Sequence, residues 1–131
     1  MGSFADFWED EILDHLFGKG AYTPPTIYVG LSTANPVDSG GGLAEPSGNS
    51  YARKVTAEGD WNAASSGAID NANAIEFAEA SGAWGTITHF ALFDALSGDN
   101  MLAYGILAQP KPIDDGDTAR FAAGDLDVSL D

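Results

Sequence analysis

The side chains that could carry acid–base or nucleophilic chemistry are two histidines, His15 and His89, set among 20 acidic residues. A Ser/His/Asp hydrolase holds its serine on a sharp turn next to a base, and the chain has no G-x-S-x-G motif that would form such a turn. His15 falls in the last turn of a predicted helix, where an imidazolium interacts favourably with the helix dipole. His89 falls in the middle of a predicted strand. We interpret both histidines as structural and predict no catalytic residue.

The acidic residues could instead act in pairs or bind a cation. Paired carboxylates catalyse glycoside hydrolysis, but with 20 acids in 131 residues such pairs arise by chance, so a small hydrolase is the weakest interpretation. Asp114-Asp115-Gly116-Asp117 could offer carboxylates to Ca²⁺, yet its spacing differs from an EF-hand loop and is typical of an Asp/Gly turn. The chain has no phosphate-binding glycine loop followed by lysine, and it has no cysteine. We therefore predict no metal and no cofactor.

Three tryptophans, Trp8, Trp61 and Trp84, are the remaining candidates for a binding function. Exposed tryptophans could stack on sugars, as in a carbohydrate-binding module. Large aromatic side chains in a domain of this size also serve as core residues or as anchors at protein interfaces. Both interpretations stay open at the level of the sequence.

The charge balance is extreme, with a formal net charge of −15 and only five basic residues: Lys19, Arg53, Lys54, Lys111 and Arg120. Such a charge repels nucleic acid and anionic lipid, so we predict neither as a partner. No run approaches the length of about 18 apolar residues that a membrane-spanning helix needs. A protein partner is expected to be basic at the contact, or to trap cations there.

Residues 4–17 are predicted to form a helix with apolar side chains on more than one side. Every fourth residue from Phe4 to Leu16 lies in one stripe, whereas Leu13 and Phe17 form a second ridge. The surface of the domain can bury one of these stripes, so the other needs a second partner. Either a sandwich edge and a long loop enclose the whole helix, or the helix docks on another chain. We favour docking. The predicted partner-binding residues are Phe4, Phe7, Trp8, Ile12, Leu13, Leu16 and Phe17.

The ends of this helix carry the usual signals. Ser3 is placed to act as the N-cap, with Asp6 three residues further on, and Gly18 is placed to end the helix in a left-handed conformation. We predict a single domain in which residues 1–18 form the amphipathic helix and residues 19–131 form a β-structure.

Residues 26–131 read as seven or eight short strands separated by Gly, Asp, Asn and Pro turns. The clearest is 86–93, whose two faces both carry apolar residues, as expected for a central strand. Strand 101–107 is expected to stop before Pro110 and Pro112, and Leu126, Val128 and Leu130 are expected to point inward. This pattern predicts a mainly β fold, an antiparallel β-sandwich or jelly roll with one N-terminal α-helix.

Residues 34–50 form a long loop by composition, rich in Gly, Ser, Pro and Asn. Loops of this length are commonly functional, so this loop is a second candidate contact region. The alternative is a mobile surface excursion.

Several motifs extend over nearly the whole chain: residues 13–18, 21–25, 28–33, 48–53, 84–95, 116–118 and 121–126. The most specific is Trp84-Gly85-Thr86-Ile87-Thr88-His89-Phe90-Ala91-Leu92-Phe93-Asp94-Ala95. In these motifs the chain resembles small virion structural proteins of tailed bacteriophages, commonly labelled tail fibre or head-decoration proteins.

The resemblance implies a non-enzymatic virion component, assembled in the cytoplasm of the bacterial host. Our leading expectation is a capsid-decorating (cement) protein that forms a homo-oligomer and contacts another virion protein, with the major capsid protein as first candidate. The alternatives are a tail fibre or tail-tip component and a carbohydrate-binding module of the virion. Removal of residues 1–18 is expected to abolish particle association and to leave a folded sandwich.

Overall fold

The computed structural model describes residues 2–98 and 100–130. Its strands form a seven-stranded sheet in the order β3-β2-β6-β7-β1-β9-β4 and a two-stranded sheet, β5-β8. The elements are β1 (Gly2–Phe4), α1 (Asp6–Leu16), β2 (Tyr28–Ser32), β3 (Lys54–Val55), the 3-10 helix η1 (Glu58–Asp60), β4 (Ala68–Asp70), β5 (Ile75–Glu76), β6 (Gly85–Phe93), β7 (Met101–Ile113), β8 (Arg120–Phe121) and β9 (Asp127–Ser129).

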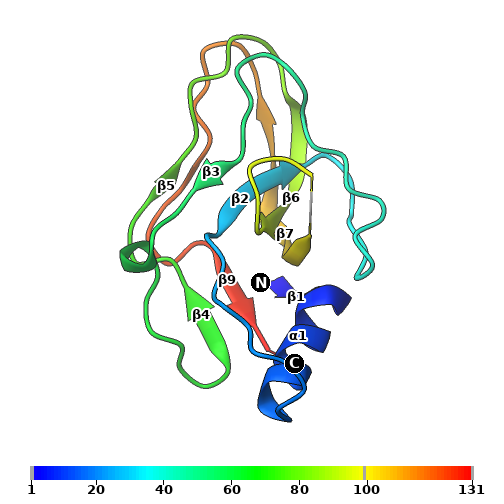
Figure 1. The fold of residues 1–131 in the computed structure, drawn as a ribbon. Helices are drawn as coiled ribbons and strands as arrows, with labels where there is room; N and C mark the ends of the chain where they lie inside the picture. Colours follow the sequence, from blue (N-terminus) through cyan, green and yellow to red (C-terminus); the bar gives the residue numbers. More distant parts are fainter. Residues whose placement is uncertain (1, 99, 131) are drawn as a thin grey trace.

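The predicted mainly β fold with one helix near the N-terminus is confirmed (Figure 1). The large sheet is curled, and its neighbours are antiparallel except for β1 and β9, which run parallel and bring the first and last strands side by side. No helix among the described residues has both the length and the apolar character that crossing a bilayer requires.

Strand β6 lies at the centre of the large sheet, between β2 and β7. Its residues from His89 to Phe93 are all buried, as predicted from the apolar residues on both of its faces. Ile87 and Phe90 belong to the main core, whereas Ala91 and Phe93 pack in a second cluster on the other face. The prediction of a central strand at 86–93 is therefore confirmed.

The small β5-β8 sheet packs over the large sheet through aromatic contacts. Phe121 of β8 lies 6.2 Å from Phe90 of β6, centroid to centroid, and 6.5 Å from Phe77. Phe77 in turn packs against Trp84, which is 5% exposed and donates its indole N–H to the carbonyl of Asn49. These contacts give the core its second layer.

Strand β7 is longer than predicted, because it continues through Pro110 and Pro112 as far as Ile113. Over this stretch β7 pairs with β6 alone, since β1 covers only residues 103–105. The two prolines are two residues apart, so both of their nitrogens face the same side of the strand. A strand with one unpaired edge tolerates prolines whose nitrogens face that edge.

The N-terminal boundary of the helix was predicted wrongly. Residues 2–4 form β1 inside the sheet, and the helix begins at Asp6 after the N-cap residue Ala5, without a side-chain cap from Ser3. Ala5 is 1% exposed and its N–H donates to the carbonyl of Leu102, so this part of the chain is held by β7. Gly18 does end the helix region with φ +73°, as predicted.

Strand β1 lies between β7 and β9, so residues 2–18 contribute a strand to the large sheet as well as the helix. A chain that lacks them loses an interior strand as well as the helix. The expectation that such a truncation leaves a folded sandwich stays a prediction, and the interior position of β1 argues against it. At the other end, Leu126 and Val128 are buried as predicted, but Leu130 is 56% exposed because β9 ends at Ser129.

Candidate interaction surface

The first half of helix α1 is covered by the protein itself. Phe7 and Trp8, together with Phe4 of β1, are partly buried and pack against the main core. Trp8 also meets Tyr22, which follows the helix, in an edge-on contact with 4.4 Å between ring centroids. Three of the seven predicted partner-binding residues are thus part of the protein's own packing.

The end of the helix is different, because Leu13, Leu16 and the C-cap residue Phe17 are 53%, 72% and 71% exposed. We call these three residues the exposed helix end. Their i, i+3, i+4 spacing places them on one side of the helix. Ile12 is half-buried and lies at the boundary between the covered and the exposed part. The alternative in which the fold encloses the whole helix is therefore wrong.

The electrostatic surroundings of the exposed helix end are acidic. Glu9, Asp10 and Asp14 on the same helix are exposed, and the basic groups near its end are His15 in the last turn and Lys19 just after the helix. A surface that covers Leu13, Leu16 and Phe17 therefore meets apolar side chains next to carboxylates. Full burial of a side chain of this size contributes about 1.5–3 kcal/mol, and less here because each is already partly covered.

The loop 34–50, the second candidate contact region, lies against the start of the helix. The carbonyl of Asp38 accepts the N–H of Asp6 at 3.1 Å, and the Asp38 carboxylate accepts the hydroxyl of Tyr104 on β7. Pro36 is among the most deeply buried residues, and the N–H of Val37 donates to the carbonyl of Gly41. The loop is tied down at several points, so the mobile-excursion alternative is not supported.

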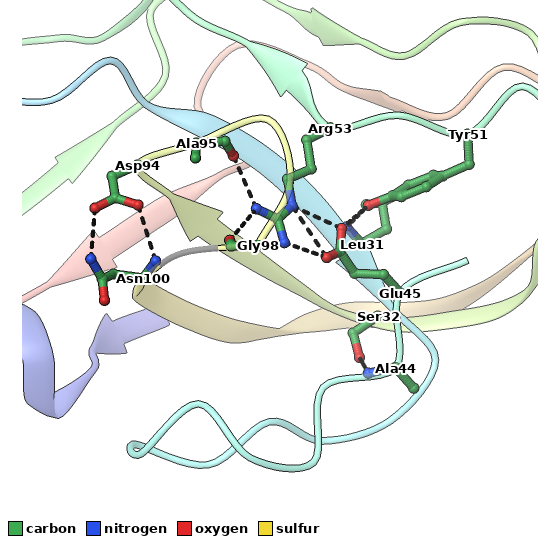
Figure 2. A network of polar contacts seen from close by, with 10 residues as sticks. All are labelled: Leu31, Ser32, Ala44, Glu45, Tyr51, Arg53, Asp94, Ala95, Gly98 and Asn100. Carbon is green, nitrogen blue, oxygen red and sulfur yellow. Dashed lines mark hydrogen bonds and ion pairs between the residues drawn. The ribbon is translucent and has the colours of Figure 1, made fainter. Parts of the chain in front are cut away.

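The end of this loop is fixed by Arg53 (Figure 2). The guanidinium is held to the Glu45 carboxylate by an Nη2–Oε1 contact of 2.5 Å and by Nε contacts of 3.1 and 3.2 Å. Its Nη1 donates to the carbonyls of Ala95 and Gly98 at 2.9 and 3.0 Å. The guanidinium carbon lies 3.4 Å from the ring centroid of Phe93. One side chain therefore joins the loop, the segment that holds Ala95 and Gly98, and β6.

Tyr51 extends this network into the sheet. Its hydroxyl donates to Glu45 at 2.7 Å and accepts the N–H of Leu31 on β2 at 3.0 Å. Burial and the neighbouring Glu45 carboxylate raise the pKa of Tyr51, so the hydroxyl stays protonated and remains a donor. The Tyr51 hydroxyl thus uses both its donor and its acceptor capacity within the protein, and the network has a structural role.

The two histidines lie on different elements, His15 on α1 and His89 on β6. His15 is exposed at the end of α1. His89 is 9% exposed, and its Nδ1 is 2.8 Å from the hydroxyl of Thr88. Burial lowers the pKa of His89, so the imidazole is neutral near pH 7.

The Asp114–Asp117 segment forms a turn. The N–H of Asp114 donates to the Asp117 carboxylate at 2.9 Å, and the N–H of Asp117 donates to the carbonyl of Asp114 at 3.0 Å. Within residues 2–98 and 100–130, no three His, Asp or Glu side chains gather in a way that could hold a metal ion.

The tryptophans also separate by environment. Trp84 belongs to the core, so it offers no stacking face to a sugar. Trp61 and Trp8 are half-buried and line the same apolar cleft, next to Phe4 and Ile69. The sequence pattern did not reveal this cleft, because its walls come from segments far apart in the chain.

A family model described as "Podophage GP4 fiber I protein gp80" matches residues 3–129. A search of the curated proteins found no match to the chain.

Proposed function

The chain belongs to the podophage GP4 fiber I protein gp80 family, a family of fibre-type phage virion proteins, and we propose that it is a structural component of a tail fibre. In this proposal the exposed helix end attaches it to a neighbouring virion protein. The resemblance to phage virion structural proteins is confirmed by the same match. The family's description is that of a structural fibre protein and not of an enzyme class.

The observation that carries the attachment is the exposure of Leu13, Leu16 and Phe17 at 53%, 72% and 71%. Three large apolar side chains on one side of a helix are the usual anchors of a helix that docks on a partner. The rest of the helix is already packed on the protein's core through Phe7 and Trp8, so the exposed end is held in a fixed orientation. A fixed helix loses little conformational entropy when it binds.

The charge supports a basic partner chain over a second copy of the same chain. A second copy brings the same acids, Glu9, Asp10 and Asp14, to the contact, and its own net charge is −15. Such a contact costs like-charge repulsion, whereas a basic virion protein gains from the same carboxylates. The partner in this proposal is therefore a different chain, although homo-oligomers held by other surfaces are compatible with it.

The fibre placement replaces capsid decoration as the leading proposal because the family is described as a fibre protein. Capsid decoration is kept as an outcome of the test. A head protein is present in many copies per particle, whereas a tail fibre component is present in few.

The test uses phage particles made without this protein, to which the purified chain is added. We compare the wild-type chain with a triple variant, Leu13→Ser, Leu16→Ser and Phe17→Ser. The matched control removes three other exposed apolar side chains, Val55, Leu96 and Ile106, which are 51%, 57% and 62% exposed. Copies bound per particle are counted by quantitative mass spectrometry, and the tails and heads are separated first.

We expect the wild type and the control to bind to the tail fraction in few copies, and the helix variant to stay in solution. Normal binding of the helix variant would refute the attachment through the helix end. Binding of the wild type to heads in many copies would refute the tail placement and restore capsid decoration.

A further inference from the structure

A second apolar surface lies inside the curl of the large sheet, apart from the exposed helix end. It is a cleft of about 750 Å³. Its floor comes from the sheet, with Leu92 of β6, Leu102 of β7 and Val128 of β9. Phe4 and Trp8 line it from the N-terminal segment, and Trp61 and Ile69 line it from the segment around β4. A volume of this size falls in the range of sites that hold an entire ligand or several side chains.

The side chains that line the cleft favour an apolar ligand. The indole N–H of Trp61 already donates to the hydroxyl of Thr56 at 3.0 Å, and the amide of Asn62 donates to Asp70 at 2.8 Å. In the part of the chain that the structure describes, no buried side-chain nitrogen or oxygen lacks a hydrogen-bond partner. A sugar needs several convergent polar groups, whereas the Trp61 and Asn62 side chains of these walls already donate within the protein. The apolar side chains of a protein segment fit them better.

The acidic rim of the cleft favours basic residues on either side of the bound apolar segment. The charged residue among the cleft residues is Glu58 of η1. Asp60 in the same turn adds a second carboxylate, while Lys54 contributes one positive charge near Asp60. Elsewhere, Arg53 is paired with Glu45, and Arg120 lies 3.8 Å from Glu76. The chain as a whole carries −15, so basic flanks are attracted to the cleft.

We propose that this cleft binds an apolar peptide segment with basic flanks, supplied by another protein of the particle. The aromatic side chains of Trp8 and Trp61 and the floor of the sheet bury the apolar residues, and Glu58 at the rim meets a basic residue. A second copy of this chain fits poorly, because its surface is as acidic as the cleft rim. The site does not depend on the fibre assignment or on the exposed helix end.

The probes are three labelled peptides of equal length: an apolar core with lysine flanks, the same core with glutamate flanks, and lysine flanks around a serine/asparagine core. Binding to the full chain is followed by fluorescence anisotropy and by the emission of the protein's tryptophans. We expect the first peptide to bind at least about tenfold more tightly than either of the others at low salt. The difference from the glutamate peptide shrinks at high salt, because screening weakens the contribution of the rim.

The variant that tests the site is Ala63→Lys, at an exposed position that lines the cleft. It brings a positive charge to the mouth without disturbing the core. The matched control is Ala83→Lys, which makes the same change at an exposed position outside the cleft residues. Ala63→Trp, which partly fills the cleft, gives a second and uncharged perturbation. Thermal unfolding of each variant shows that the fold is kept.

We expect Ala63→Lys and Ala63→Trp to weaken binding of the lysine-flanked apolar peptide at least about fivefold relative to Ala83→Lys. The helix variant Leu13→Ser, Leu16→Ser, Phe17→Ser is expected to bind this peptide as the wild type does. Equal binding of all three peptides, or no binding up to about 1 mM, would overturn the proposal, as would an Ala63→Lys affinity equal to that of Ala83→Lys. Loss of binding in the helix variant alone would move the site to the helix end.

Discussion

Replacement of Arg53 by methionine is the substitution whose effect on stability follows most directly from the structure. The Arg53 side chain is 6% exposed and that of its partner Glu45 is 20% exposed. In Arg53→Met the Glu45 carboxylate keeps the Tyr51 hydroxyl as a donor but loses every contact with the guanidinium. The carbonyls of Ala95 and Gly98 lose their donor as well.

Removal of one member of a fully buried ion pair costs about 3–5 kcal/mol, because the other charge is left without compensation, and the 20% exposure of Glu45 places Arg53→Met at the lower end of this range. Methionine keeps most of the apolar stem of arginine, so little of the cost comes from lost packing. For a chain of 131 residues, a loss of that size lowers the Tm by roughly 10–20 °C. We expect the free energy of unfolding to fall by this amount in Arg53→Met.

Urea unfolding followed by tryptophan emission measures the effect, and the m-value should not change. Lys54→Met is the control, because Lys54 is exposed, and its effect should stay within about 0.5 kcal/mol. The double variant Arg53→Met, Glu45→Met should be more stable than Arg53→Met, since replacing a buried pair by apolar residues is often close to neutral. A cost below about 1 kcal/mol for Arg53→Met, or strictly additive single effects, would contradict the role assigned to this pair.

Two further substitutions test particular contacts. Gly105→Ala places a Cβ 2.7 Å from the Cα of Gly2 and from the Phe90 ring. We therefore expect the free energy of unfolding, measured in urea, to fall by about 1–3 kcal/mol. Gly20→Ala is the control and should be close to neutral, because the added Cβ has no atom within 4 Å. Burial lowers the pKa of His89 below its ordinary value of 6.5. The unfolded chain therefore takes up the proton first, and the free energy of unfolding falls as the pH drops from 7 through 6.5. The variant His89→Gln should lose less stability over that interval, and a pH profile equal to that of the wild type would contradict this.

The strands were predictable where the pattern is local. Residues 86–93 carry apolar side chains on both faces, and this alone identifies an interior strand. The error at the N-terminus has a physical cause: Phe4 and Trp8 are four residues apart and fit helical periodicity, but the gap between β7 and β9 is visible only once those strands are placed. The prolines of β7 were misjudged for a similar reason, because an unpaired edge cannot be read from the strand's own residues.

The candidate surface was predictable in part. The excess of apolar side chains on the helix is present in the sequence, but the division between covered Trp8 and exposed Leu16 depends on which segments pack beside the helix. The Arg53–Glu45 pair has no signal in the sequence, since one basic residue eight positions from one acid in a loop is unremarkable by itself. The cleft around Trp61 likewise depends on residues brought together by the curl of the sheet.

The most direct test is an image of the intact phage particle by electron cryomicroscopy, at a resolution that shows side chains. We expect this chain in the tail, with Leu13, Leu16 and Phe17 covered by a neighbouring chain that is basic at the contact. A particle in which these three side chains face solvent in every copy would contradict the account.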